Sequence, residues 1–247
     1  MHRNHFAPLV RIMLVPMALA ILLSGCLYRE AVSENPSDAY REGVNRIQLA
    51  VDQYQSDHEL LPLITPSEET PKYEKFRVDL VLLQKQGYLE SIPRAAFENG
   101  GSVYFLIQNE ELDPVIKIMD LTTVQYVNDV ERLAAKYREQ QGGVLPVKKE
   151  DGELPEGIHR IDLKAMGGEN YVLKSVYSGL ELNYLINEEG KVYVDYAPDL
   201  MQIVERMGIT LSDDNDIREM LTEQSYFVPV KSLPYFWKDN RPIPQPE

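Results

Sequence analysis

The chain has 247 residues, of which 44% are hydrophobic and 26% charged, a composition typical of a globular protein with one or two domains. It carries 39 acidic and 25 basic residues, a formal net charge of −14 at pH 7. Nucleic-acid binding depends on Lys and Arg set against phosphate, so this acidic balance excludes nucleic acid from the expected partners. The single Cys excludes a disulfide framework.

The first residues have the pattern of a signal peptide that ends at the lone Cys. Arg3 and Arg11 make the N-terminus basic, and an apolar run over residues 12–22 follows them. This run is shorter than the about 20 apolar residues that a spanning helix needs. The run leads into Leu23-Ser24-Gly25-Cys26, where small residues stand just before the thiol. The alternatives are an ordinary signal peptide with an accidental Cys and a short N-terminal anchor.

This tetrapeptide resembles the lipobox of bacterial lipoproteins, and the chain as a whole resembles uncharacterised lipoproteins of Bacillus-type Gram-positive bacteria. The resemblance implies that residues 1–25 are removed and that acyl chains such as palmitate on Cys26 anchor the protein in the bilayer. Two acyl chains suffice for stable anchoring. We therefore expect a location on the extracytoplasmic side of the cell membrane, with residues 26–38 as a flexible tether.

A first helix is predicted to begin at an N-cap of Ser37 or Asp38 and to end before Leu60-Leu61-Pro62. Its apolar residues step by four and three, which places them on one face. These residues are Tyr40, Val44, Ile47, Val51 and Tyr54.

The region after Pro71 has the spacing of a second helix that stops at Gly87. Its apolar stripe contains Phe76, Val78, Leu80, Val81, Leu82 and Leu83. Pro93 and the turn residues Asn99-Gly100-Gly101 then lead to two apolar runs at residues 103–107 and 115–119. These runs predict an antiparallel hairpin.

After residue 122 the pattern of helix, Leu-Pro, turn and hairpin starts again. Most matching positions are 83 residues apart (127 − 44), while the strand match has an offset of 80 (184 − 104), as if the second copy had lost residues in its turn. On the helices, Val44, Ile47, Val51 and Tyr54 match Val127, Val130, Ala134 and Tyr137. In the segments that follow, Leu61-Pro62 matches Leu145-Pro146, and residues 77–80 match residues 160–163. In the hairpins, residues 104–106 match residues 184–186, and the strand ending at Asp120 matches the strand ending at Asp195. The alternative is two unrelated α+β segments whose turn and helix-breaking residues have similar spacing.

One copy is similar to the globular part of type II pseudopilins in the order of Leu82-Leu83, Gly87-Tyr88-Leu89 and Pro93. The resemblance implies only a shape, a helix laid across a small antiparallel sheet, because the chain lacks the pseudopilin N-terminus. We predict an α+β fold of two similar modules, each a helix packed on a small antiparallel sheet, over residues 39–122 and 123–208.

Residues 209–247 are expected to add a C-terminal helix, a strand and a Pro-rich tail. A helix over residues 200–207 ends at Gly208, and Ser212 is predicted to cap a further helix with acidic residues in its first turn. Residues 226–230 have the composition of a final edge strand. The tail, with four prolines, is expected to be extended and poorly ordered.

No catalytic or metal-binding pattern emerges from the candidate residues. The run from Asp213 to Asp216 fails the spacing of a calcium loop, and His58 and His159 have no ligand-spaced neighbours, so both are expected at the surface or in loops. The segments around Ser102, Ser175 and Ser178 lack the nucleophile-elbow motif, and the Gly pairs match no phosphate-binding loop. We therefore predict no catalytic residue, no cofactor and no metal, and Cys26 is the one assigned site.

The aromatic residues leave two interpretations open. Tyrosines on or beside predicted strands are commonly core residues, but aromatic surfaces also bind partners or sugars. The residues concerned are Tyr104, Tyr184, Tyr193, Tyr196, Tyr226, Phe227, Tyr235, Phe236 and Trp237.

The leading hypothesis is a non-enzymatic, membrane-anchored envelope protein whose modules contact an unknown envelope protein. The alternative is the substrate-binding lipoprotein of an ABC-type transporter, although the chain is small for a two-lobed receptor. A cell-wall enzyme using one of the many acidic pairs ranks third.

Overall fold

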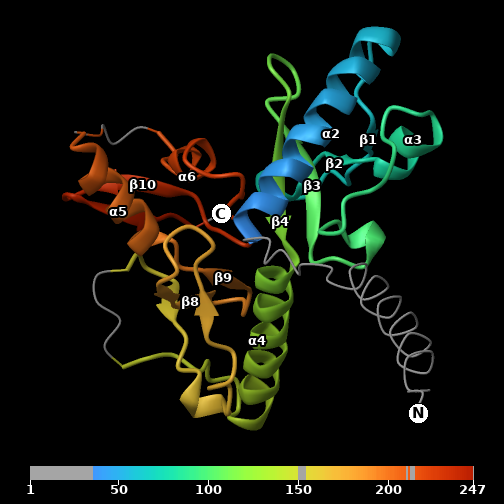
Figure 1. Ribbon diagram of the computed structural model, residues 1–247. Coiled ribbons are helices and arrows are strands. Elements are labelled where there is room, and N and C mark those ends of the chain that lie inside the picture. The colour runs from blue at the N-terminus through green and yellow to red at the C-terminus, as the bar shows by residue number, and fades with distance from the viewer. Residues whose placement is uncertain (1–35, 150–153, 210, 212–214, 247) are drawn as a thin grey trace, which may run out of the picture. The chain divides into compact units, whose positions relative to one another are not determined.

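The computed structural model of the protein describes residues 36–149, 154–209, 211 and 215–246 (Figure 1). The predicted signal peptide, the lipobox with Cys26 and most of the predicted tether lie outside these residues, as do Ser212, Asp213 and Asp214. The described residues form an α+β fold, as predicted, and Ala39–Glu247 is one compact unit. Of the helices described, none has both the length and the apolar character needed to cross a membrane.

Module 1 consists of the helix α2 (Pro36–His58) packed on a four-stranded antiparallel sheet (Figure 1). The predicted apolar face of α2 is correct, since four of its five residues are buried against the sheet and Tyr40 is partly buried. The helix begins one or two residues before the predicted N-cap. The strands, in sheet order, are β1 (Leu63–Ile64), β2 (Arg77–Val78), β3 (Val103–Gln108) and β4 (Val115–Asp120).

The predicted second helix is wrong in its first half. The helix α3 (Leu80–Lys85) begins only at Leu80. Asp79 is its N-cap, and the Asp79 side chain accepts a hydrogen bond from the backbone N–H of Leu82 in the first turn. Val78 lies instead on β2 and pairs with β1, so pairing along the chain overrides the helical spacing. The short 3-10 helix η2 (Lys72–Glu74) precedes it. The predicted stop at Gly87 is correct, because Gly87 has a φ of 86° and the backbone bonds there form the closing motif of a helix C-terminus.

Module 2 repeats this plan with a smaller sheet. The helix α4 (Leu121–Gln140) buries Val127, Val130 and Ala134, as predicted, against the core of a three-stranded antiparallel sheet. Figure 1 shows α4 running alongside β8 and β9. The strands of this sheet are β5 (Ile158–Arg160), β8 (Tyr184–Asn187) and β9 (Val192–Val194), and between β5 and β8 the chain forms the 3-10 helix η4 (Lys164–Met166) and the strand pair β6 (Leu173–Lys174) and β7 (Glu181–Leu182).

Each module has an equivalent backbone hydrogen bond to the proline of its Leu-Pro pair. The N–H of Asp79 donates to the carbonyl of Pro62 at 2.8 Å, and the N–H of Asp162 donates to that of Pro146 at 2.8 Å. Each Asp side chain then accepts from backbone N–H groups of the short helix that follows it. The sequence matches at this point therefore join residues with the same local structure.

The strand match is displaced by one residue. The pairing of β2 with β3 and of β5 with β8 makes Leu106 equivalent to Leu185, not to Ile186 as the sequence alignment predicts. Tyr184 is thus the counterpart of Phe105, and both side chains lie in the core beneath the helix of their module. A shift of one residue in a strand moves each side chain to the opposite face, so the alignment by residue type is wrong here.

The C-terminal part differs most from prediction. The helix α5 (Ala197–Met207) ends at Gly208 as expected, but α6 (Glu219–Glu223) begins well after the predicted cap. The tail contains a hairpin of β10 (Tyr235–Lys238) and β11 (Arg241–Pro244). Asp239 and Asn240 have φ values of 51° and 60°, the conformation of a two-residue hairpin turn, which the proline content concealed.

Residues 226–234, which we call the C-terminal strap, join the two sheets. The N–H of Ile118 in β4 donates to the carbonyl of Tyr226 at 2.7 Å, and Val228 donates back to Ile118 at 2.9 Å. Further along, the N–H of Val194 in β9 donates to the carbonyl of Lys231 at 2.8 Å. In place of the predicted regular strand, the strap adds backbone hydrogen bonds to the outer strand of each module.

Candidate functional site

A pocket with a volume of about 380 Å³ lies where module 1, module 2 and the C-terminal strap meet. Module 1 contributes η2, module 2 contributes α4 and β9, and the strap contributes its second half. A volume of this order suits a small molecule. We treat this pocket as the candidate functional site.

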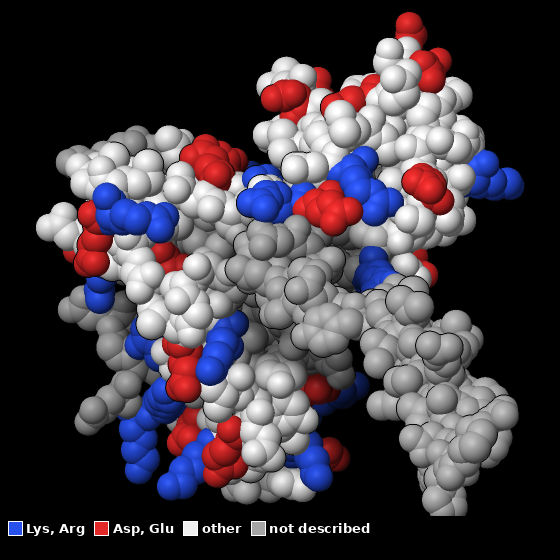
Figure 2. Space-filling view, in the orientation of Figure 1, with Lys and Arg blue, Asp and Glu red and all other residues white. Residues whose placement is uncertain are grey.

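The lining of the pocket is more cationic than the rest of the chain. It contains four basic and two acidic residues, namely Lys72, Lys191, Arg218, Lys231, Glu74 and Glu131. This excess of two positive charges contrasts with the net charge of −14 of the whole chain. On the face seen in Figure 2, Lys and Arg are interspersed with Asp and Glu. The lining is therefore less acidic than the chain as a whole, although Lys72 and Arg218 also have carboxylate partners outside it.

Arg218 is fixed by its neighbours and gives the pocket a rigid wall. Its side chain donates to both oxygens of Asp216, with 2.6 Å between Nη2 and Oδ2, and Nη1 donates to the carbonyl of Ser232 at 2.9 Å. Burial alone would raise the pKa of Asp216, but the hydrogen bonds and charge of Arg218 outweigh it, so that this pKa is lowered. The guanidinium is thus already paired with a carboxylate.

The two lysines from η2 and the strap have weaker partners. The Nζ of Lys72 lies 2.7 Å from an oxygen of Glu219, and both side chains are more than half exposed. The Nζ of Lys231 lies 3.9 Å from an oxygen of Glu74, the outer limit of an ion pair. Exposed pairs contribute little to stability, so an incoming anion competes with the Lys72–Glu219 pair at small cost.

Tyr73 is the most unusual residue of the site. It is 3% exposed, and its hydroxyl has no hydrogen-bond partner among the described residues. The guanidinium carbon of Arg218 lies 4.9 Å from the ring centroid. Burial raises the pKa of Tyr73, so the hydroxyl stays protonated and acts as a donor. A buried donor without an acceptor is costly, and a bound ligand atom would remove that cost.

A second polar cluster lies beneath the first turn of α5. Asp199 is 1% exposed and accepts hydrogen bonds from the hydroxyls of Ser175 and Ser178. Burial raises the pKa of Asp199, and the two serine hydrogen bonds oppose this rise. The hydroxyl oxygen of Ser175 also accepts from the backbone N–H groups of Tyr177 and Ser178, so its hydrogen bonds are used within the loop itself. We interpret the cluster as a structural tie between α5 and the loop before β7.

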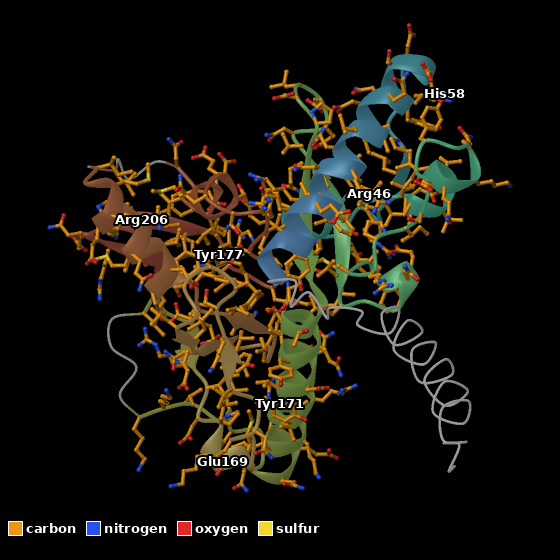
Figure 3. The ribbon with its side chains drawn as sticks, in the orientation of Figure 1. Arg46, His58, Glu169, Tyr171, Tyr177 and Arg206 are labelled. Carbon is orange, nitrogen blue, oxygen red and sulfur yellow. The ribbon has the colours of Figure 1, made fainter. Side chains whose placement is uncertain are left out.

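The histidines are not brought together. Figure 3 shows His58 at the C-terminal end of α2, where it is exposed, as expected, and where its Nε2 lies 3.1 Å from the hydroxyl of Tyr88. His159 lies on β5. Within the described part of the chain, no three His, Cys, Asp or Glu side chains are placed to share a metal ion. Asp216, the described part of the acidic run, is committed to Arg218.

The tyrosines named from the sequence are mainly core residues. Tyr184, Tyr196 and Tyr235 are at most 2% exposed, and Figure 3 shows Tyr171 beside α4, where its ring contacts that of Tyr126. Tyr193 is buried too and also lines the pocket. The other pocket residues could not be found from the sequence because they come from segments far apart in the chain.

An α+β protein with a polar pocket is the class that these observations define. Within it, residues 40–120 match the model of the YphF family N-terminal domain, a bacterial family. The match covers about a third of the chain and lies on module 1, so similarity to this family extends over that module. No curated protein and no solved structure matches the chain.

Proposed function

We propose that the protein is a lipid-anchored lipoprotein on the extracytoplasmic side of the cell membrane and that it acts by binding, not by catalysis. The motif Leu23-Ser24-Gly25-Cys26 supports the anchor, since the lone Cys of the chain stands where lipidation requires it. The pocket between the modules supports the binding role, because it joins cationic side chains to a buried donor that has no acceptor.

The anchor is tested by the change Cys26→Ser in cells fed with labelled palmitate. We expect the wild-type chain to take up label and to fractionate with membranes, and the variant to lose the label. The matched control is Ser24→Ala, which keeps a small residue before the Cys and should remain labelled. Equal labelling of wild type and Cys26→Ser would contradict the proposal.

The partner is expected to be another envelope protein, and crosslinking of the intact protein in cells tests this. Mass spectrometry of the crosslinked products should identify envelope proteins, with crosslinks from either module or from the strap. A protein that crosslinks to nothing above the level of an unrelated lipoprotein would contradict a role in protein contact.

A second candidate is the substrate-binding lipoprotein of an ABC-type transporter. The observation that favours it is the position of the pocket, which receives residues from both modules. A permease or an ATPase subunit among the crosslinked proteins would select this candidate over an accessory role. Crosslinks confined to cell-wall or secretion proteins would select the accessory role.

A further inference from the structure

The pocket has the features of a site for an anion, and its lining indicates which kind. We propose that it binds a small molecule that carries a phosphate monoester, with Lys72, Lys231 and the hydroxyl of Tyr73 as its principal contacts. The inference rests on the binding part of the proposed function and is independent of the anchor. It assigns a class of ligand to a pocket that the proposed function describes only by its lining residues.

Charge is the first argument for an anionic ligand. The lining has four basic and two acidic side chains, and Arg218 and Lys72 also pair with Asp216 and Glu219 outside it. An anionic group of a ligand can take the place of such a carboxylate. The ion pair of Lys72 with Glu219 is exposed, and the ion pair of Lys231 with Glu74 is long. Lys72 can therefore turn to a ligand without leaving a charge buried. Glu74, whose side chain is 15% exposed, keeps a hydrogen bond from the backbone N–H of Lys231 when the side chain of that lysine turns.

The number of acceptor oxygens separates phosphate from carboxylate. Arg recognises carboxylates through two parallel hydrogen bonds, but the fork of Arg218 is already engaged with Asp216. The remaining cations are lysines, compact charges that bind phosphate without such a planar match. Both lysines already pair with carboxylates, so their charge alone does not select the anion. A phosphate monoester has three acceptor oxygens and can therefore accept from both lysines and from a further donor at once.

Tyr73 supplies the second, independent argument. Its buried hydroxyl is a donor without an acceptor, and it belongs to a residue of the lining. A phosphate oxygen is an acceptor of the required kind. Pro71, Pro229, Pro234 and Tyr193 provide apolar surface for the body of the ligand. The site therefore fits a phosphate group attached to a small organic body.

The test uses the full-length protein in detergent micelles and isothermal titration calorimetry. The probes are glycerol 1-phosphate, phosphatidic acid mixed into the micelles, and succinate at matched ionic strength. We expect saturable binding of a phosphate probe and weaker binding of succinate. Preference for the soluble ester or for the lipid then tells whether the phosphate comes from a metabolite or from a headgroup.

Two variants and two matched controls connect binding to the pocket. Tyr73→Phe removes only the hydroxyl and should weaken the phosphate probe by about tenfold without lowering the unfolding temperature. Tyr177→Phe removes another buried hydroxyl without a partner among the described residues, outside the lining, and should leave affinity unchanged. Lys231→Met should also weaken binding by about tenfold, whereas Lys85→Met, the same charge change on exposed α3, should not.

The proposal is overturned by no saturable binding of either phosphate probe, by tighter binding of succinate, or by wild-type affinity in both pocket variants. Each of these results leaves the palmitate labelling of Cys26 unaffected. Failure of the ligand class and failure of the anchor are therefore distinguishable.

Discussion

Modules 1 and 2 share a plan but differ in what they bury. In module 1 the buried residues between α2 and the sheet are apolar, and no fully buried polar or charged residue occurs between residues 40 and 120. Among the described residues, all buried polar or charged side chains lie in module 2 and the C-terminal part, including Asp195, Asp199 and Arg218. The core of module 1 is thus apolar, and its charged groups, among them Lys72 and Glu74 of the pocket, lie outside that core.

The sheets differ in the same sense. Module 1 has four strands, whereas the counterpart of β1 in module 2 is a single bridge between Val147 and Ile161. Module 2 instead has the additional pair β6 and β7, and the serines of the polar cluster lie next to it. The comparison shows that the same arrangement of helix and sheet forms with a smaller sheet, when polar loops such as the one between β6 and β7 take the place of strand pairing.

The largest expected effect is the loss of core volume at equivalent positions. Ile47 on α2 and Val130 on α4 are each 0% exposed and lie 83 residues apart (130 − 47). Ile47→Ala should cost about 3–4 kcal/mol of unfolding free energy and Val130→Ala about 2 kcal/mol, in proportion to the volume removed. Urea unfolding measures both values.

The same experiment tests whether the strap couples the modules. We expect one cooperative transition in both variants, because the strap is bonded to β4 and to β9. Two separate transitions, with only one of them shifted in each variant, would contradict this coupling.

A smaller effect, of opposite sign at two carboxylates, is expected on changing the pH. The pKa of Asp199 is raised by burial, so the stability it contributes declines as pH rises from about 3.8 through its folded value. The pKa of Asp216 is lowered by Arg218, so its contribution is present above about 3.8 and is lost as pH falls below that value.

The variants Asp199→Asn and Asp216→Asn separate the two carboxylates. Relative to wild type, Asp199→Asn should become more stable as pH rises above 3.8, and Asp216→Asn should lose its disadvantage below 3.8. Thermal unfolding at a series of pH values gives both differences. Parallel curves for wild type and both variants would refute the assigned shifts.

Local patterns made the helix α2 and the hairpin of β3 and β4 predictable. The apolar stripe of α2 and the two apolar runs around a turn each have one regular structure that buries them. Phe76 and Val78 were not predictable in this way, because their apolar side chains suit a helix or a strand, and only the pairing of Val78 with Leu63 decides between them. The β10–β11 hairpin was missed because its prolines indicated an extended tail.

The candidate site was less predictable than the fold. Its residues come from three separate segments, and no motif in any of these segments indicates a site. Lys72 and Tyr73 lie in η2, Arg218 lies just before α6, and Lys231 lies in the strap. The unsatisfied hydroxyl of Tyr73 is a property of packing alone. The internal repeat carried information on helices and loops, but its strand alignment was displaced because the segment before β8 is shorter. Leu185 lies 25 positions after its partner Arg160 (185 − 160), whereas Leu106 lies 29 positions after its partner Arg77 (106 − 77).

The smallest expected effect concerns the two equivalent Asp residues, Asp79 and Asp162. Each side chain accepts hydrogen bonds from the N–H groups at the start of the next short helix, which in module 1 is the six-residue α3 and in module 2 the three-residue η4. Loss of such a cap costs about 1 kcal/mol. Asp79→Ala should therefore lower the unfolding free energy by about 1 kcal/mol, and Asp162→Ala by less, because fewer helical residues depend on it.

The matched replacements Asp79→Asn and Asp162→Asn retain a capping oxygen and should cost only a few tenths of a kcal/mol each. Urea unfolding at neutral pH resolves the Ala from the Asn variants. A larger cost at Asp162 than at Asp79 would show that module 2, with its smaller sheet, depends more on this turn than module 1 does. In that case the shared hydrogen bond to the Leu-Pro carbonyl would stabilise the two modules to different degrees.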